Sequence, residues 1–144
     1  MVVPLDDESR VSIPASALAE IANLTRSQSK QVETELKKIT SANYTPSKFV
    51  YKQYGDLKVF RCGDVVRIFG VILENLDVVD DFDHLVIILE VSEHDYQQAG
   101  VTKGQAREIQ SVFGDIDSEE AFWNELEGTI FDQSDIRNIF DSEE

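Results

Sequence analysis

The stretch GDLKVFRCGDVVRIFGVI, residues 55–72, decides the fold class of this chain. Apolar and β-branched residues lie on both sides of Gly63-Asp64, a pair typical of tight turns, so the stretch predicts a β-hairpin. A second apolar run, LVIILEV at 85–91, has the length of a strand and the composition of a central strand buried on both faces. The short alternation at residues 11–13 is compatible with an edge strand. We therefore expect three consecutive strands and, before them, a possible fourth at an edge.

Two amphipathic helices are expected before the hairpin. Pro14 suits the first position of a helix, and apolar residues follow it at helical spacing, which predicts a short helix over 14–24. Thr25 and Gln28 have the spacing of a capping box at the start of a second helix. The apolar stripe of that helix consists of Val32, Leu36 and Ile39. We predict an α+β domain over residues 1–104, in which an N-terminal helical hairpin packs on a small antiparallel sheet.

Residues 105–144 are predicted to be an acidic, helical C-terminal extension. Thr102 and Gln105 form another capping-box pair, and Gly114 is expected to end the helix that they begin. Ser118 opens a further amphipathic stretch. The last helical stretch is expected to contain Ile130, Phe131, Ile136, Ile139 and Phe140.

The charge of the chain is unevenly distributed. Of its 144 residues, 28 are acidic and 13 basic, which gives a formal net charge of −15. Such an excess ordinarily argues against nucleic acid, because affinity for phosphates comes mainly from Lys and Arg. Residues 26–67 nevertheless carry nine basic and four acidic residues, whereas residues 105–144 carry two basic and twelve acidic ones. The basic centre is the expected RNA-facing surface. Adaptation to a high-salt cytoplasm is a second explanation for the global acidity.

The composition also bounds the compartment and the chemistry. A single cysteine cannot form a disulfide framework or a cysteine-based zinc site, and no run of about 18 apolar residues is present to span a membrane. The first residues lack the basic start and apolar core of a signal peptide, so we expect a cytoplasmic protein. No glycine-rich phosphate loop is present, and no cofactor is expected.

Two further candidates for chemistry are weaker. Cys62 lies beside Arg61, which could lower the pKa of its thiol, but a single thiol at a hairpin turn is more often a packing residue. An acidic loop with a neighbouring histidine offers possible metal ligands, although such loops are usually just solvated. Its residues are Asp80, Asp81, Asp83 and His84. We predict no metal site.

The helical pair, the hairpin at 55–72 and the strand that runs into SEHDY at 92–96 together resemble the RelE/ParE toxin superfamily of toxin–antitoxin systems. The resemblance covers about residues 14–100 and implies a RelE-like fold. The RelE branch cleaves mRNA in the ribosomal decoding site without a metal, by attack of a ribose 2′-OH on the adjacent phosphate. This chemistry needs a proton acceptor, cations beside the phosphate and a proton donor for the leaving oxygen.

Carried over by position, the resemblance implies a phosphate-stabilising role for Arg67 and catalytic positions for His94 and Tyr96. The residues expected to bind RNA are Lys52, Lys58 and Arg61. The gap from His94 to Tyr96 is tighter than in many members of the family. Alternation along a strand places Lys58 and Arg61 on opposite faces unless the strand bulges. The expected partners are the ribosome with its mRNA, or an antitoxin-like protein.

A non-catalytic protein-interaction module of the same fold is the alternative. In that case Arg67 is a structural ion-pair partner of Asp64 or Glu90. The C-terminal residues resemble the motif by which proteins dock on the sliding clamp of replication, with an isoleucine in place of the usual first aromatic. The partner-binding residues are then Gln133, Ile136, Ile139 and Phe140. The apolar ones could instead pack on Phe122, Trp123 and Leu126, and the acidic segment could cover the basic region in cis, as antitoxins do in trans.

Overall fold

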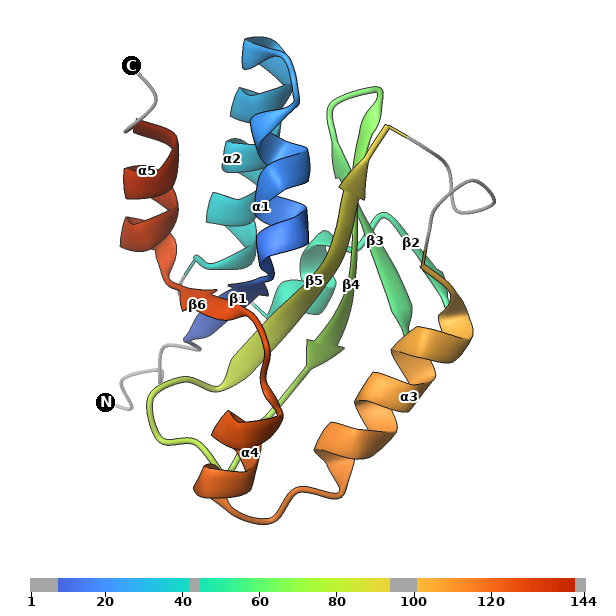
Figure 1. Cartoon of the computed structure of the whole chain (residues 1–144), viewed down its shortest axis with the longest axis vertical. Coiled ribbons are helices and arrows are strands. Elements are labelled where there is room, and N and C mark those ends of the chain that lie inside the picture. Colours follow the sequence, from blue (N-terminus) through green and yellow to red (C-terminus); the bar gives the residue numbers. More distant parts are fainter. Residues whose placement is uncertain (1–7, 42–44, 94–100, 142–144) are drawn as a thin grey trace, which may run out of the picture.

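The computed structural model describes residues 8–41, 45–93 and 101–141 (Figure 1). A six-stranded sheet with the order β2-β3-β4-β5-β1-β6 is its centre. The strands are β1 (Ser9–Ile13), β2 (Lys52–Tyr54), β3 (Leu57–Cys62), β4 (Val66–Leu73), β5 (His84–Ser92) and β6 (Thr129–Phe131). The helices are α1 (Ala15–Ala22), α2 (Arg26–Ile39), the 3-10 turn η1 (Pro46–Phe49), α3 (Lys103–Gly114), α4 (Glu119–Glu125) and α5 (Gln133–Asp141). The predicted mixture of helices and strands is confirmed.

The sheet is mixed, not purely antiparallel as expected. Strands β2 to β5 are antiparallel neighbours in chain order, and Gly63, with a φ of +73°, makes the turn of the predicted hairpin. Strand β1 runs parallel to β5, and β6 pairs antiparallel with β1. The expectation of an edge strand at residues 11–13 is therefore wrong, because β1 lies inside the sheet.

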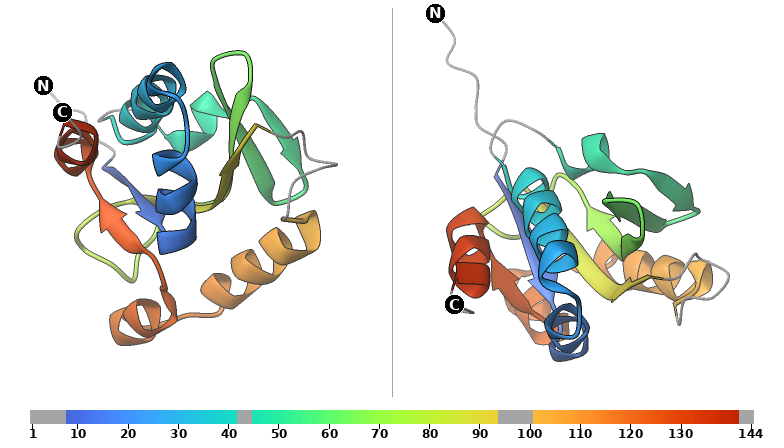
Figure 2. Two further views of the ribbon diagram at one scale, coloured as in Figure 1. Left: turned by 45° about the horizontal axis from the view of Figure 1, so that its top comes forward. Right: turned by 90° about the horizontal axis from the view of Figure 1, so that it is seen from above.

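Helices cover both faces of the sheet (Figure 2). Helices α1, α2 and α5 contribute to the first core, whose buried members include Val32, Leu36, Phe60, Ile68 and Ile136. Helices α3 and α4 contribute to the second core, whose buried members include Leu57, Val59, Phe69, Ala106 and Phe122. Burial of one such large side chain stabilises the fold by about 1.5–3 kcal/mol. None of the helices in the described ranges is long and apolar enough to cross a membrane.

Both predicted capping boxes are present. The Thr25 side chain accepts a hydrogen bond from the Gln28 N–H at 3.2 Å, and the Thr25 N–H donates to the Gln28 side chain at 3.1 Å. Thr102 and Gln105 make the same pair of bonds at the start of α3. These bonds satisfy N–H groups that a helix start leaves without intrahelical partners.

The C-terminal segment is part of the sheet. Ile130 and Phe131 belong to β6, so the prediction that they lie in a helix is wrong. Gly128 allows this strand to reach β1, since a Cβ at this position would lie 2.3 Å from Ser12 Oγ. Because β6 and α5 complete the sheet and the first core, the predicted boundary at 104/105 does not divide the structure.

Candidate nucleic-acid interface

Three cations surround the ring of Tyr51, which is 43% exposed. The centroid of the ring lies 5.4 Å from Lys52 Nζ, 5.5 Å from Arg61 Cζ and 5.2 Å from Arg67 Cζ. Cations at this distance are attracted to the negative charge of the ring. We call these four residues the Tyr51 cluster.

The register of the hairpin brings the two arginines together. Arg61 on β3 is directly opposite Arg67 on β4, and alternation places both on the face of the second core. Like charges in this arrangement repel. The aromatic ring beside them and the carbonyl groups of the hairpin turn offset part of that repulsion.

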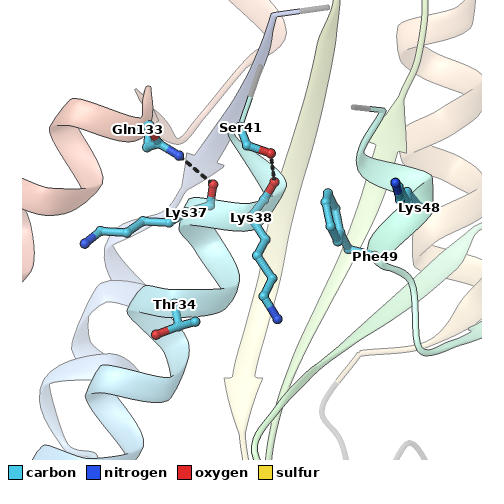
Figure 3. A pocket seen from close by; sticks show the side chains of 7 residues that line it. All are labelled: Thr34, Lys37, Lys38, Ser41, Lys48, Phe49 and Gln133. Atoms are coloured by element: carbon cyan, nitrogen blue, oxygen red, sulfur yellow. Dashed lines mark hydrogen bonds between the residues drawn. The ribbon is translucent and has the colours of Figure 1, made fainter. Parts of the chain in front are cut away.

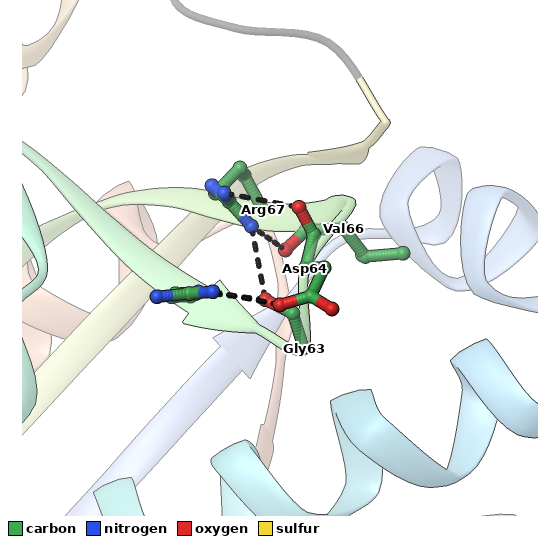
Figure 4. Close-up of polar contacts among 5 residues, drawn as sticks. Gly63, Asp64, Val66 and Arg67 are labelled. Atoms are coloured by element: carbon green, nitrogen blue, oxygen red, sulfur yellow. Dashed lines mark hydrogen bonds and ion pairs between the residues drawn. The ribbon is translucent and has the colours of Figure 1, made fainter.

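The hairpin turn holds Arg67 through main-chain oxygens (Figure 4). Its guanidinium donates to Val66 O at 2.9 Å, to Gly63 O at 3.3 Å and to Asp64 O at 3.3 Å. The Asp64 carboxylate, which was one candidate ion-pair partner of Arg67, instead pairs with Arg61 at 2.8 Å. Arg67 is half-buried and ties the turn together.

Arg61 is held more loosely. Its Nε donates to Gly63 O at 2.8 Å, and its ion-pair partner Asp64 is strongly exposed. Exposed pairs of this kind contribute about 0–1 kcal/mol, so the pair can be exchanged for another anion at little cost. Arg61 and Lys52 are therefore the members of the cluster that can reach a phosphate without disturbing the turn.

The structure brings together some of the predicted RNA-binding residues and separates others. Lys52 and Arg61 lie in the cluster with Arg67, whereas Lys58 lies on the opposite face of β3. The Lys58 Nζ donates to Gln53 Oε1 at 3.0 Å and to Gly55 O at 3.3 Å. His94 and Tyr96 lie outside the described residues.

Tyr51 was missed by the sequence reasoning. Its signal was an aromatic residue beside a lysine in the basic stretch, a combination typical of surfaces that bind single-stranded nucleic acid. The convergence on Tyr51 depends on the pairing of β2, β3 and β4, which the local sequence does not specify.

The C-terminal segment lies away from the Tyr51 cluster. Strand β6 and strand β2 are at opposite edges of the sheet, and α5 packs on α2 (Figure 1). Covering the cluster in cis would require β6 and α5 to leave the β1 edge.

The four residues of the clamp-like motif are used within the fold. Ile136 is fully buried, Ile139 and Phe140 pack against the first core, and Gln133 Nε2 donates to Lys37 O at 2.9 Å. The expected packing on Phe122, Trp123 and Leu126 is wrong, because Phe122 and Leu126 pack in the second core on the other face of the sheet. Docking on a partner would require α5 to unpack from α2.

The other chemical candidates are structural. Cys62 is buried in the first core, and burial, with a smaller contribution from Glu35, raises the pKa of its thiol. His84 is buried, and its Nδ1 accepts a hydrogen bond from the Asn75 N–H at 3.2 Å. Within residues 8–41, 45–93 and 101–141, no three His, Cys, Asp or Glu side chains are grouped so that they could hold a metal ion.

No protein-family model matches this chain, and no match is found among curated proteins or solved structures.

Proposed function

We propose that this protein binds RNA through the Tyr51 cluster, as a RelE-like factor that acts on or binds the translation machinery. The observation that carries the proposal is the convergence of three cations on one exposed ring in a chain of net charge −15. Cations that neutralise phosphates release counterions, which drives binding. A chain this acidic has no general attraction for RNA, so a local cluster of positive charge is needed.

The RelE-like part of the proposal is supported by the arrangement of the N-terminal half. Helices α1 and α2 follow each other in the chain and contribute to the same core, against strands β3, β4 and β5. Those three strands are consecutive and antiparallel, as the resemblance implies for residues 14–100. Strand β6 and helix α5 are additions to that plan.

The ties of Arg67 favour RNA binding over cleavage as the primary role of the cluster. Its three bonds to carbonyl oxygens leave it positioned to support the turn, while Lys52 and Arg61 contact the phosphates. Metal-independent cleavage by Arg67 with His94 and Tyr96 is the more demanding form of the proposal. It requires Arg67 to exchange carbonyl oxygens for a phosphate.

The test is the salt dependence of binding to a short single-stranded RNA, measured by fluorescence anisotropy. Each lost phosphate contact lowers the slope of log K against log salt by about 0.7. We expect this decrease for Arg61→Gln and for Lys52→Gln. Lys30→Gln, an equal change of charge at an exposed position of α2, should leave the slope unchanged. Equal effects of all three variants, or no RNA binding by the wild type, would overturn the proposal.

Co-sedimentation with ribosomes, followed by mapping of mRNA ends, separates the two forms of the function. A ribosome-dependent nuclease produces new ends that disappear in Arg67→Ala. A non-catalytic interaction module of the same fold, the second candidate, produces none. That candidate is favoured by the engagement of Arg67 with the turn.

A further inference from the structure

A second basic site lies on the other side of the molecule's first helical layer, where α2 ends. A pocket of about 540 Å³ is formed there by the end of α2, by η1 and by Gln133 at the start of α5 (Figure 3). Lys37 and Lys38 reach it from α2, and Lys48 from η1. None of these residues belongs to the Tyr51 cluster.

The lining of this pocket has the opposite charge to the chain as a whole. It contains three of the 13 basic residues, and none of the described residues that line it is acidic. Lys37 is paired with Glu33 at 2.9 Å, outside the lining. Lys38 lies 3.9 Å from Glu35, which is buried, and burial raises the pKa of that carboxyl group. The positive charge of Lys38 is therefore only weakly compensated.

The end of a helix normally disfavours an anion, because its last carbonyl groups carry partial negative charge. Here those carbonyls already accept hydrogen bonds. The Thr40 hydroxyl donates to Leu36 O at 2.8 Å, Gln133 Nε2 to Lys37 O at 2.9 Å and the Ser41 hydroxyl to Lys38 O at 2.6 Å. The α2 terminus therefore presents lysine side chains and bonded carbonyls to the pocket, and an anion can approach it.

An aromatic ring completes the site. Phe49 is half-buried, lines the pocket and lies between the Lys38 and Lys48 side chains in Figure 3. An apolar ring beside ammonium groups suits a ligand that has a planar part and an anionic part. A cavity of this size is within the range that holds small molecules.

We propose that this pocket binds a nucleotide, with the phosphate on Lys38 and Lys48 and the base against Phe49. The proposal stands independently of RNA binding at the Tyr51 cluster. It predicts that Tyr51→Ala and Arg61→Gln leave nucleotide binding unchanged, so failure at one site can be told from failure at the other.

Isothermal titration with AMP, adenosine and inorganic phosphate tests this proposal on the full chain. AMP should bind more tightly than either of its parts. Loss of one charge-assisted bond weakens binding about tenfold, so we expect that change for Lys38→Gln and for Lys48→Gln. The matched control is Lys30→Gln, which has the same change of charge on α2 outside the pocket and should bind AMP like the wild type.

Phe49→Leu separates the two halves of the ligand. It should weaken AMP and adenosine and leave phosphate unchanged. Circular dichroism shows whether the variant is folded, and the lysine variants decide the question if it is not. The absence of AMP binding to the wild type, or equal weakening by Lys30→Gln and Lys38→Gln, would refute the nucleotide site.

Discussion

Replacement of Ile136 by alanine should destabilise the whole domain, although Ile136 lies near the end of an acidic segment. The side chain is fully buried in the first core, where α5 packs on α2. Truncation of a buried isoleucine to alanine costs about 2–5 kcal/mol, because transfer energy is lost and a cavity remains. Helix α5 lies at the margin of the core, where partial collapse is possible, so we expect about 3 kcal/mol.

Urea unfolding followed by both circular dichroism and Trp123 fluorescence measures this loss. Trp123 lies on α4, and its ring contacts Phe82 and Phe122, the latter in the second core, so it reports on the opposite face of the sheet from α5. If α5 and the sheet unfold together, both signals shift to the same lower midpoint. The control is Asn138→Ala on the exposed side of α5, which should change stability by less than about 0.5 kcal/mol.

Wild-type stability of Ile136→Ala would refute the reasoning. It would mean that α5 is a dispensable extension, as the sequence suggested, and that its apolar residues are available to a partner. Two separate transitions would also contradict a single cooperative structure, because they would show that α5 detaches before the sheet unfolds.

Three other predictions concern positions in the cores. Gly128→Ala should destabilise by about 2 kcal/mol in thermal unfolding, since the new Cβ would lie 2.3 Å from Ser12 Oγ, whereas Gly114→Ala, with nothing within 4 Å, should not. The raised pKa of Glu35 means that its ionised form opposes folding, so Glu35→Gln should stabilise the protein at pH 7. That gain should shrink as the pH is lowered toward the ordinary carboxyl value, because the folded state then takes up the proton; a constant gain across pH would contradict it. Cys62 should react with a thiol reagent at pH 8 only after denaturation, since it is buried and its pKa is raised; rapid labelling of the native protein would contradict this.

Local signals in the sequence predicted the elements that local interactions define. The capping boxes at Thr25 and Thr102 need only four consecutive residues each, and the hairpin around Gly63 needs one turn between two apolar runs. These features were predictable because the residues that make the contacts are close in the chain.

The parts that were missed depend on partners far away in the sequence. Residues 129–131 have apolar side chains that also fit a helical pattern, and they become a strand because β1 offers an unpaired edge. Strand β1 was expected at an edge because nothing near it indicates that β5 will pair with one side and β6 with the other. The Tyr51 cluster was missed for the same reason, since its cations come from two strands and a loop that meet only through the register.

The position of β1 has a consequence for synthesis of the chain. This strand is made early, but one of its neighbours in the sheet starts at His84 and the other at Thr129. The sheet cannot be completed until residue 131 has left the ribosome, and closing such long loops slows folding. During translation, β1 must therefore keep an unpaired edge that can associate with other nascent chains. Chaperone capture of nascent chains should accordingly persist until the last residues of the chain are made.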